Sequence, residues 1–259
     1  MIDATAFVHS SAKIGEGTTI GRHAYIGAGV EIGKDCEIRP YVTILGPTVL
    51  GDRNRVFQYA SLGDEPQDLS FKGEPTRLVI GHDNVFREYV TVHRGTVKGG
   101  GLTQIGHHNY LMVYAHVAHD CKLGDHIVMV NYAGLSGHIE VENHVTIGGY
   151  CGGHHFVRMG AYAFLSHACL LVRDVPPFMM VVGGGGSPRV TGLNVRGLQR
   201  NGFSPEEIQA LKQVYKLYYR STLSQSEVLA KIEVEIVPNC PRAQQFCDFI
   251  RHSQRGVMR

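Results

Sequence analysis

The sequence predicts a mainly β protein: a left-handed parallel β-helix of hexapeptide repeats with a C-terminal α-helical domain. The first observation is that every sixth residue from Ile2 to Leu62 is aliphatic. The second is that the residue four places after each aliphatic is mostly small or β-branched, as at Ala12 and Val30. The third is that glycine often follows the aliphatic directly, as after Ile14. Neither a helix of period 3.6 nor a strand of period 2 produces this pattern, so it indicates a structural repeat.

Three hexads form one triangular coil whose aliphatic side chains point inward. A single coil cannot bury its own apolar face, so stability comes from stacking coils at about 4.8 Å. The pattern continues through Ile80, Phe86 and Val92, and then from Ile105 to Leu171. We therefore predict a β-helix over residues 1–186 and a helical domain over residues 187–259.

Two segments are expected to leave the coil as extruded loops. The step from Val92 to Ile105 exceeds two hexads by one position, so residues 97–103 must lie outside the repeat. Residues 65–77 contain two prolines and lose the aliphatic pattern, although Leu62 and Ile80 are three full hexads apart and keep the repeat arithmetically.

The repeat ends near residues 174–177, and the pattern beyond residue 187 becomes helical. Ser204 as N-cap, Pro205 at the first helical position and Glu207 as partner of the cap predict a helix start with a capping box. We expect a second helix over residues 224–237 and a third from residue 241 to near residue 256.

Composition excludes some classes of protein. No apolar run approaches the roughly 20 residues that a membrane span needs, and the N-terminus enters the repeat without the pattern of a signal peptide. The six cysteines show no CxxC spacing and are read as reduced packing residues of a cytoplasmic protein. Residues 187–259 carry 11 basic and 6 acidic groups, which suits an acidic partner or phosphates, although a solvated helical surface explains the charge equally well.

The coil length of three hexads indicates which side chains stack. It places His119, Gly137 and His155 in one column, and it places Asp120 under His138. His154 stacks over Ser136 at the same corner. An isolated histidine is usually a surface or turn residue, but this stacked group favours a functional site.

The chemistry expected at this corner is acyl transfer. A neutral His119 can remove a proton from a hydroxyl, and Asp120 can stabilise the imidazolium that results. Gly137 exposes a backbone N–H with no side chain in the way, which suits an oxyanion donor. Zinc is the rival, because trimeric β-helices similar to γ-carbonic anhydrase bind zinc through histidines, but the spacing of His116 and His119 does not match that pattern. A third alternative is a β-helix that serves only as a scaffold or binding module.

Several motifs resemble the UDP-N-acetylglucosamine 3-O-acyltransferases, the first acyltransferases of lipid A synthesis, and the likeness covers the whole chain. These motifs are residues 66–69 (PQDL), 93–96 (HRGT), 115–121 (AHVAHDC), 137–138 (GH), 174–177 (DVPP), 192–194 (GLN) and 202–204 (GFS).

The resemblance implies a cytoplasmic homotrimer with active sites between subunits. It implies transfer of a 3-hydroxyacyl chain from acyl carrier protein to the glucosamine 3-position of a UDP-sugar, with no metal, bound cofactor or nucleic acid, since phosphopantetheine arrives on the carrier. Carried over by position, His119 is the base, Asp120 its partner and Gly137 the oxyanion donor. The residues that would bind sugar, acyl chain or nucleotide are Asp68, His116, His138, His154, Asn194 and Arg200.

Some positions depart from the resemblance. Ser70 stands where lysine is usual, with Lys72 as a possible substitute, and His155 stands where glutamine is usual. Arg196 and Asn201 also differ from the pattern usual for the nucleotide-binding stretch. These changes leave the acid–base chemistry intact but affect the acceptor site.

His167 stands at the position that resembles the family's hydrocarbon ruler, where some members have glycine. Its neighbours one coil below and above are Gly149 and Gly185, so we expect His167 to narrow a groove and shorten the acyl chain. The alternative, that His167 points elsewhere and caps a coil, stays open.

The sequence leaves alternatives for both the branch of acyltransferases and the group that accepts the acyl chain. A related N-acyltransferase of the same pathway also has a β-helix, but that family normally adds an N-terminal uridine-binding domain, and here the repeat begins at Ile2. The acceptor can carry a 3-hydroxyl or a 3-amino group, because both present a nucleophile to His119.

Overall fold

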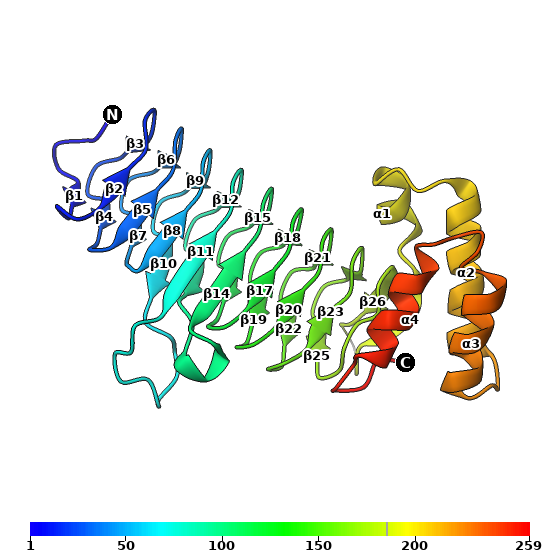
Figure 1. The fold of residues 1–259 in the computed structure, drawn as a ribbon. Coiled ribbons are helices and arrows are strands. Elements are labelled where there is room, and N and C mark those ends of the chain that lie inside the picture. Colours follow the sequence, from blue (N-terminus) through cyan, green and yellow to red (C-terminus); the bar gives the residue numbers. More distant parts are fainter. Residues whose placement is uncertain (185) are drawn as a thin grey trace.

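The computed structural model describes residues 1–184 and 186–259, which form a long triangular β-helix followed by a small helical domain (Figure 1). Within the described residues, the strands form three sheets of nine, eight and ten strands. We call these sheets I, II and III.

The strands of sheet I are β1 (Phe7–Val8), β4 (Tyr25–Ile26), β7 (Thr43–Ile44), β10 (Ser61–Asp64), β13 (Thr91–His93), β16 (His116–Val117), β19 (Gly134–Leu135), β22 (Gly152–Gly153) and β25 (Leu170–Leu171). The strands of sheet II are β2 (Lys13–Ile14), β5 (Val30–Ile32), β8 (Thr48–Leu50), β11 (Arg77–Ile80), β14 (Leu102–Ile105), β17 (Lys122–Leu123), β20 (Glu140–Val141) and β23 (Arg158–Met159). The strands of sheet III are β3 (Thr19–Ile20), β6 (Glu37–Ile38), β9 (Arg55–Val56), β12 (Val85–Phe86), β15 (Tyr110–Leu111), β18 (Val128–Met129), β21 (Thr146–Ile147), β24 (Phe164–Leu165), β26 (Met179–Val182) and β27 (Arg189–Leu193).

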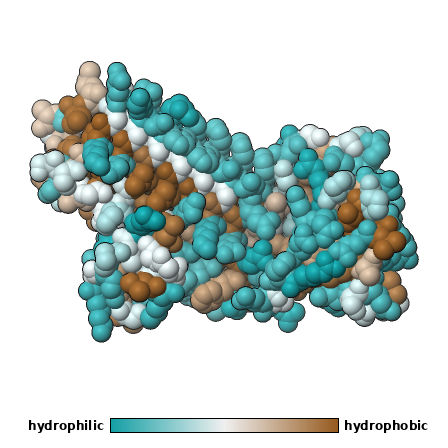
Figure 2. Space-filling view, viewed as in Figure 1, coloured by the Kyte–Doolittle hydropathy of each residue, from teal (hydrophilic) through white to brown (hydrophobic). Residues whose placement is uncertain are grey.

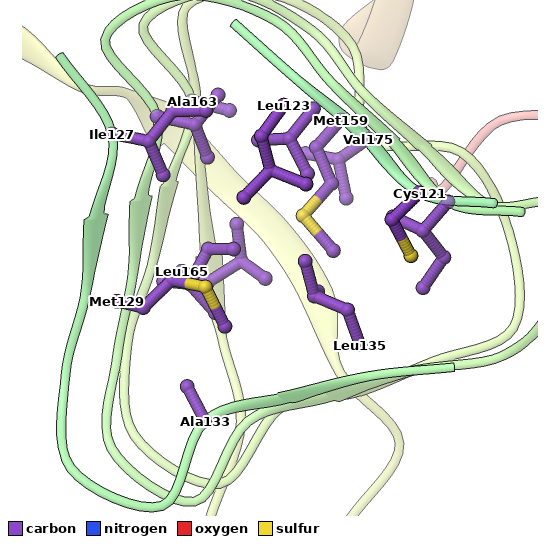
Figure 3. Close-up of a cluster of buried hydrophobic side chains, with 14 of the residues drawn as sticks. Cys121, Leu123, Ile127, Met129, Ala133, Leu135, Met159, Ala163, Leu165 and Val175 are labelled. Atoms are coloured by element: carbon purple, nitrogen blue, oxygen red, sulfur yellow. The ribbon is translucent and has the colours of Figure 1, made fainter. Parts of the chain in front are cut away.

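The aliphatic of each hexad points into the triangle and forms the core, as the repeat predicts. In one coil Leu123, Met129 and Leu135 come from sheets II, III and I and converge on the axis (Figure 3). All three are buried, and complete burial of such a side chain stabilises the fold by about 2 kcal/mol. Stacking of equal coils therefore supplies the stability that one coil lacks.

The corners between sheets explain why residues one coil apart touch. Most corner residues adopt a left-handed conformation with positive φ, as do Tyr132 and Tyr150. Their side chains stack on the next coil, and the ring centroids of these two tyrosines are 4.8 Å apart. Residues that the coil length predicts to stack are therefore in direct contact from one coil to the next.

Two loops leave the coil at the same corner, where sheet I passes to sheet II. The first lies between β10 and β11, and the second lies between β13 and β14 and contains a short 3₁₀ helix, η1 (Val97–Gly99). In Figure 1 both project from the same edge of the β-helix. Leu62 and Ile80 lie on different sheets although three hexads of sequence separate them, because the first loop expands a single hexad.

The last coil is shorter than the others. Ile147 pairs with Leu165 one full coil further on, whereas Leu165 pairs with Val181, which falls two positions short of a full coil. Strand β27 then pairs antiparallel with β26, so residues beyond 187 still add to sheet III.

The helical domain comprises α1 (Val195–Arg200), α2 (Pro205–Arg220), α3 (Gln225–Glu235) and α4 (Ala243–Arg251) within the described residues. Both Ser204 and Ser224 form capping boxes, with Glu207 and Glu227 as partners. The short helix α1 was not expected from the sequence, because Gly197 interrupts its apolar pattern. Helix α4 ends earlier than expected, and the chain beyond it returns to the β-helix, where the N–H of Met258 bonds to Asp174.

The structure bears on the predicted state of the cysteines and on the predicted lack of a membrane span. The six cysteines are free and buried, and burial raises the pKa of the Cys121 thiol to about 12. Across residues 1–184 and 186–259, every helix is too short or too polar to cross a bilayer.

Candidate functional site

His119 lies two residues after the end of β16, at the corner from which the loops emerge. The sequence predicts it on the outside of the coil, but the second loop covers it and leaves the residue only 7% exposed. Its Nδ1 lies 2.7 Å from Oδ2 of Asp120. Because a carboxylate accepts hydrogen bonds, this contact assigns the proton to Nδ1 and leaves the lone pair on Nε2.

Asp120 is held from the loop side as well. Its Oδ1 accepts the N–H of Thr96 at 2.7 Å, and its Oδ2 accepts the Thr96 hydroxyl at 2.6 Å. The N–H of Asp120 donates to the Thr103 hydroxyl at 2.8 Å. A Cβ added to Gly99 would lie 2.1 Å from the carboxylate carbon, so only glycine lets the loop cross here. The loop therefore orients the carboxylate and shields it from water.

Gly137 lies one coil beyond His119, against the imidazole. A Cβ on Gly137 would lie 2.4 Å from Cε1 of His119, so any side chain would displace the ring. Within the part of the chain that the structure describes, the N–H of Gly137 donates to no acceptor. At the same hexad position, Lys34 and His107 donate their N–H to an aspartate of the next coil at 2.8 and 2.7 Å. The N–H of Gly137 is thus a donor available to an anion.

Two further histidines at this corner have lowered pKa values. The Nδ1 of His116 lies 2.8 Å from the Thr91 hydroxyl, and burial lowers the pKa of His116 to about 4. The Nε2 of His138 lies 3.7 Å from Asp120, and burial lowers the pKa of His138 although the carboxylate opposes the shift. Lowered pKa values make both side chains hydrogen-bonding groups rather than cations near neutral pH.

A groove of about 530 Å³ runs along sheet I from this corner. Its polar end is lined by His116, His119, Gly137, His154, His155 and Gln67. Its floor follows Gly134 and Gly152, which have no side chains, and it ends at Leu170 and Val172, both exposed. A groove that is polar at the His–Asp pair and apolar beyond it suits a chain whose reacting end is polar.

The first loop brings Asp68 and Ser70 toward the same corner. Both the N–H and the hydroxyl of Ser70 donate to Asp68 at 2.8 Å, and these bonds lower the pKa of Asp68. Lys72, the expected substitute for a lysine at position 70, is exposed, and its N–H bonds to Glu74. Lys98 of the second loop instead places its Nζ 2.6 Å from the Ser70 hydroxyl.

Asn194 and Arg200 lie elsewhere in the single chain. They line a cavity of about 750 Å³ between sheet III and α1, away from sheet I. Asn194 caps α1 by accepting the N–H of Gly197 at 3.1 Å and donates to the carbonyl of Tyr162 at 2.9 Å. The residues expected to bind nucleotide therefore do not meet the His–Asp pair within one chain.

His167 lies at the corner between sheets III and I and is exposed. The shortened last coil changes its neighbours: a Cβ on Gly184 would lie 2.8 Å from Nε2 of His167. The expected neighbour Gly185 lies outside the described residues. Within one chain His167 does not line the groove on sheet I, whose apolar end is formed by Leu170 and Val172.

Sequence reasoning missed Thr96, Lys98 and Gln67. A signal for them was available, because both extruded loops interrupt consecutive coils at the hexad that leads from sheet I to sheet II. His119 lies at the same step one coil further on, so loop residues had to cover it.

A metal is the alternative occupant of this corner, because ligand atoms of His119, Asp120 and His138 all lie within 4.8 Å of one another. Nitrogen and oxygen donors of this kind suit zinc. However, the Asp120 oxygens already accept bonds from Thr96 and His119, and a metal would have to displace them. The hydrogen-bond pattern therefore favours proton transfer.

A His–Asp pair, a free N–H donor and an adjoining groove on stacked hexads are typical of acyltransferases built on a left-handed parallel β-helix. The comparisons with known proteins agree. A family model described as UDP N-acetylglucosamine O-acyltransferase, domain 2, matches residues 174–258. A relative from Syntrophobacter fumaroxidans, named acyl-[acyl-carrier-protein]–UDP-N-acetylglucosamine O-acyltransferase, is 44% identical and covers 100% of this chain and 99% of its own. The chain belongs to the UDP-N-acetylglucosamine O-acyltransferase family.

Solved structures support the same assignment and confirm the predicted fold. The UDP-N-acetylglucosamine acyltransferase of Francisella novicida matches with a TM-score of 0.96 and 42% identity, covering 100% of this chain and 94% of its own. The corresponding enzyme of Bacteroides fragilis matches with a TM-score of 0.95 and 36% identity over 100% of both chains.

Proposed function

We propose that the chain transfers a 3-hydroxyacyl group from acyl carrier protein to the glucosamine 3-position of UDP-N-acetylglucosamine, in lipid A biosynthesis. Family membership supports the reaction, and one observation supports the mechanism. That observation is the buried His119–Asp120 pair beside the free N–H of Gly137, at the polar end of an apolar groove.

In this mechanism Nε2 of His119 removes the proton of the sugar hydroxyl as its oxygen attacks the thioester carbonyl. The N–H of Gly137 donates to the oxyanion of the tetrahedral intermediate, and Asp120 stabilises the imidazolium. When the intermediate collapses, the C–S bond breaks and His119 returns the proton to the departing thiolate. A 3-amino acceptor would follow the same steps with nitrogen as nucleophile.

Acceptor and acyl chain would be held by groups around the pair. We assign this role to Asp68, His116, His138, His154 and His155, with Ser70 as part of the Asp68 turn and Lys72 at its exposed edge. Neutral His116 and His138 suit hydrogen bonds to hydroxyls and amides. His167 remains the proposed limit on acyl length.

The nucleotide would be bound by a neighbouring subunit. Asn194 and Arg200 lie at the two ends of α1, beside sheet III, so they reach a His–Asp pair only if another copy places this side of its chain against sheet I. A guanidinium suits the diphosphate. We therefore propose a homotrimer with sites between subunits.

We further propose a cytoplasmic enzyme that uses no resident metal or cofactor. The thioester of the carrier supplies both the acyl group and the leaving group, so the reaction requires no redox step. Acyl carrier protein is expected to meet the basic C-terminal domain, whose surplus of arginine and lysine suits an acidic partner.

The test incubates the protein with 3-hydroxyacyl carrier proteins of several chain lengths and with either UDP-sugar, and identifies products by mass. Wild type should form product with and without a chelator, and His119→Ala should lower kcat by about 10³-fold, in the range of lost general-base catalysis. His108→Ala, at an exposed corner away from the groove, is the matched control and should retain activity. The proposal fails if no pair of substrates yields product, or if the chelator abolishes turnover.

A further inference from the structure

Lys98 extends from the loop that orients the catalytic pair toward the loop that carries Asp68. It lies in η1, whose N-cap Thr96 also binds the Asp120 carboxylate. The Nζ of Lys98 reaches Ser70 of the first loop at 2.6 Å. The position of this ammonium group is therefore coupled to the geometry of the His119–Asp120 pair.

The charge of Lys98 has no ion-pair partner within the described residues, where no carboxylate oxygen lies within 4.0 Å of its Nζ. Two hydrogen bonds from Ser70 lower the pKa of Asp68, and the nearby positive charge of Lys98 lowers it further. Lys98, Ser70 and Asp68 therefore form a chain of polar contacts between the two loops, next to Gln67, which lines the polar end of the groove. An exposed ammonium group without a carboxylate partner, on a loop beside the polar end of the groove, suits an anionic or strongly polar ligand.

We propose that Lys98 binds the nucleoside diphosphate sugar and holds it beside His119, a role that rests on the proposed function. The sugar nucleotide fits this position better than the carrier arm does. Its phosphate is attached to the same sugar ring as the reacting 3-position, whereas the carrier phosphate is separated from the thioester by the whole pantetheine arm. Lys98 thus supplies from the second loop the positive charge that Ser70 cannot supply from the first.

The experiment measures steady-state kinetics of Lys98→Gln, Lys98→Arg and the double variant Ser70→Lys with Lys98→Gln. Lys98→Gln should raise KM for the UDP-sugar about tenfold, as expected when one charge-assisted contact is lost, with kcat and the KM for acyl carrier protein near wild type. Lys98→Arg should stay close to wild type. Lysine at position 70 should restore the KM, because it returns the charge to the same place from the other loop.

Lys122→Gln serves as the matched control, since this exposed lysine lies on the outer face of sheet II and pairs with Glu140. An unchanged KM for the UDP-sugar in Lys98→Gln would overturn the proposal, as would a rise confined to the carrier protein. Failure of the double variant to recover would show that Lys98 only ties the loops together. These outcomes differ from failure of the proposed function, in which wild type itself forms no product or His119→Ala stays active.

Discussion

At the scale of single residues, the histidines around His119 differ from it in the role that their environment favours. His116 and His138 are both partly withdrawn from water, and burial lowers both pKa values. Because His116 and His138 are neutral, we expect His119 to be the histidine that gains and loses the proton. Its Nδ1 is bonded to Asp120, so Nε2 is the atom that exchanges the proton with substrate. The Asp120 carboxylate can then stabilise the imidazolium of His119, because the nearby His138 stays uncharged.

The buried state of His116 predicts a pH dependence of stability. Its folded pKa of about 4 lies below the ordinary value of 6.5, so the folded protein binds fewer protons than the unfolded chain between these values. This contribution to the free energy of unfolding is complete above pH 6.5 and declines as pH falls to about 4, by roughly 2–3 kcal/mol. Urea unfolding of wild type and His116→Asn at fixed protein concentration should show a weaker acid-side decline in the variant. Parallel curves would contradict the assignment.

At the scale of elements, the stacked coils and the second loop contribute different features of the site. The repeat of equal coils stacks Gly137 on His119 and His138 on Asp120, as the sequence predicts. The orientation of Asp120 depends on Thr96, which lies in a loop with no repeat of its own. The stacked coils therefore set the positions of the site residues. The second loop buries the His119–Asp120 pair and supplies the hydrogen bonds that orient Asp120.

The groove on sheet I predicts how acyl length is limited. Gly134 and Gly152 leave the floor open, and Leu170 closes the same column one coil further on. Leu170→Ala should extend the preferred chain by about two carbons, since each newly buried methylene contributes about 0.8 kcal/mol, roughly fourfold in kcat/KM. Mass analysis of products from a set of 3-hydroxyacyl carriers measures this shift.

His167→Gly, assayed with the same set of carriers, tests the separate proposal for His167. If His167 limits chain length, its removal should also favour longer chains. An unchanged profile would reject that role and leave Leu170 as the end of the groove. Wild-type profiles in both variants would contradict the placement of the acyl chain on sheet I.

At the scale of the whole molecule, the three sheets present different outer faces. Sheet II bears charge pairs, with Lys13 to Glu31 at 2.6 Å and Lys122 to Glu140 at 3.8 Å. Sheet III also carries a charge pair near its N-terminal end, Arg55 to Glu37 at 3.1 Å, but four of its later strands bear half-buried apolar and aromatic residues: Val85, Tyr110, Val128 and Phe164. In the view of Figure 2, hydrophobic residues gather in a band over the N-terminal coils, beside a strongly hydrophilic edge. This asymmetry suits packing between copies through sheets I and III, with sheet II toward water.

Shared sites predict that two inactive variants complement each other. His119→Ala removes the base from one side of an interface, and Arg200→Ala removes the proposed phosphate contact from the other. In a cyclic trimer assembled at random from equal amounts, about a quarter of the interfaces keep both residues. Mixed trimers should therefore recover about a quarter of wild-type turnover at low UDP-sugar, while each variant alone stays low. No recovery would contradict a site shared between subunits.

Sequence alone determined the β-helix, its three faces and the corner that carries His119, Asp120 and Gly137. It could do so because a repeat of equal coils makes spatial neighbours of residues at a constant spacing. The capping boxes at Ser204 and Ser224 were likewise predictable, because they depend on residues within one turn.

Tertiary structure decided what the repeat cannot describe. It buried the His–Asp pair under Thr96 and brought Lys98 rather than Lys72 to Ser70. It also placed Asn194 and Arg200 at α1 beside sheet III, away from the pair on sheet I. It also shortened the last coil, which changed the neighbours of His167. The physical reason is common to all of these: loops and chain ends take their positions from packing between distant segments, and no local spacing encodes those contacts.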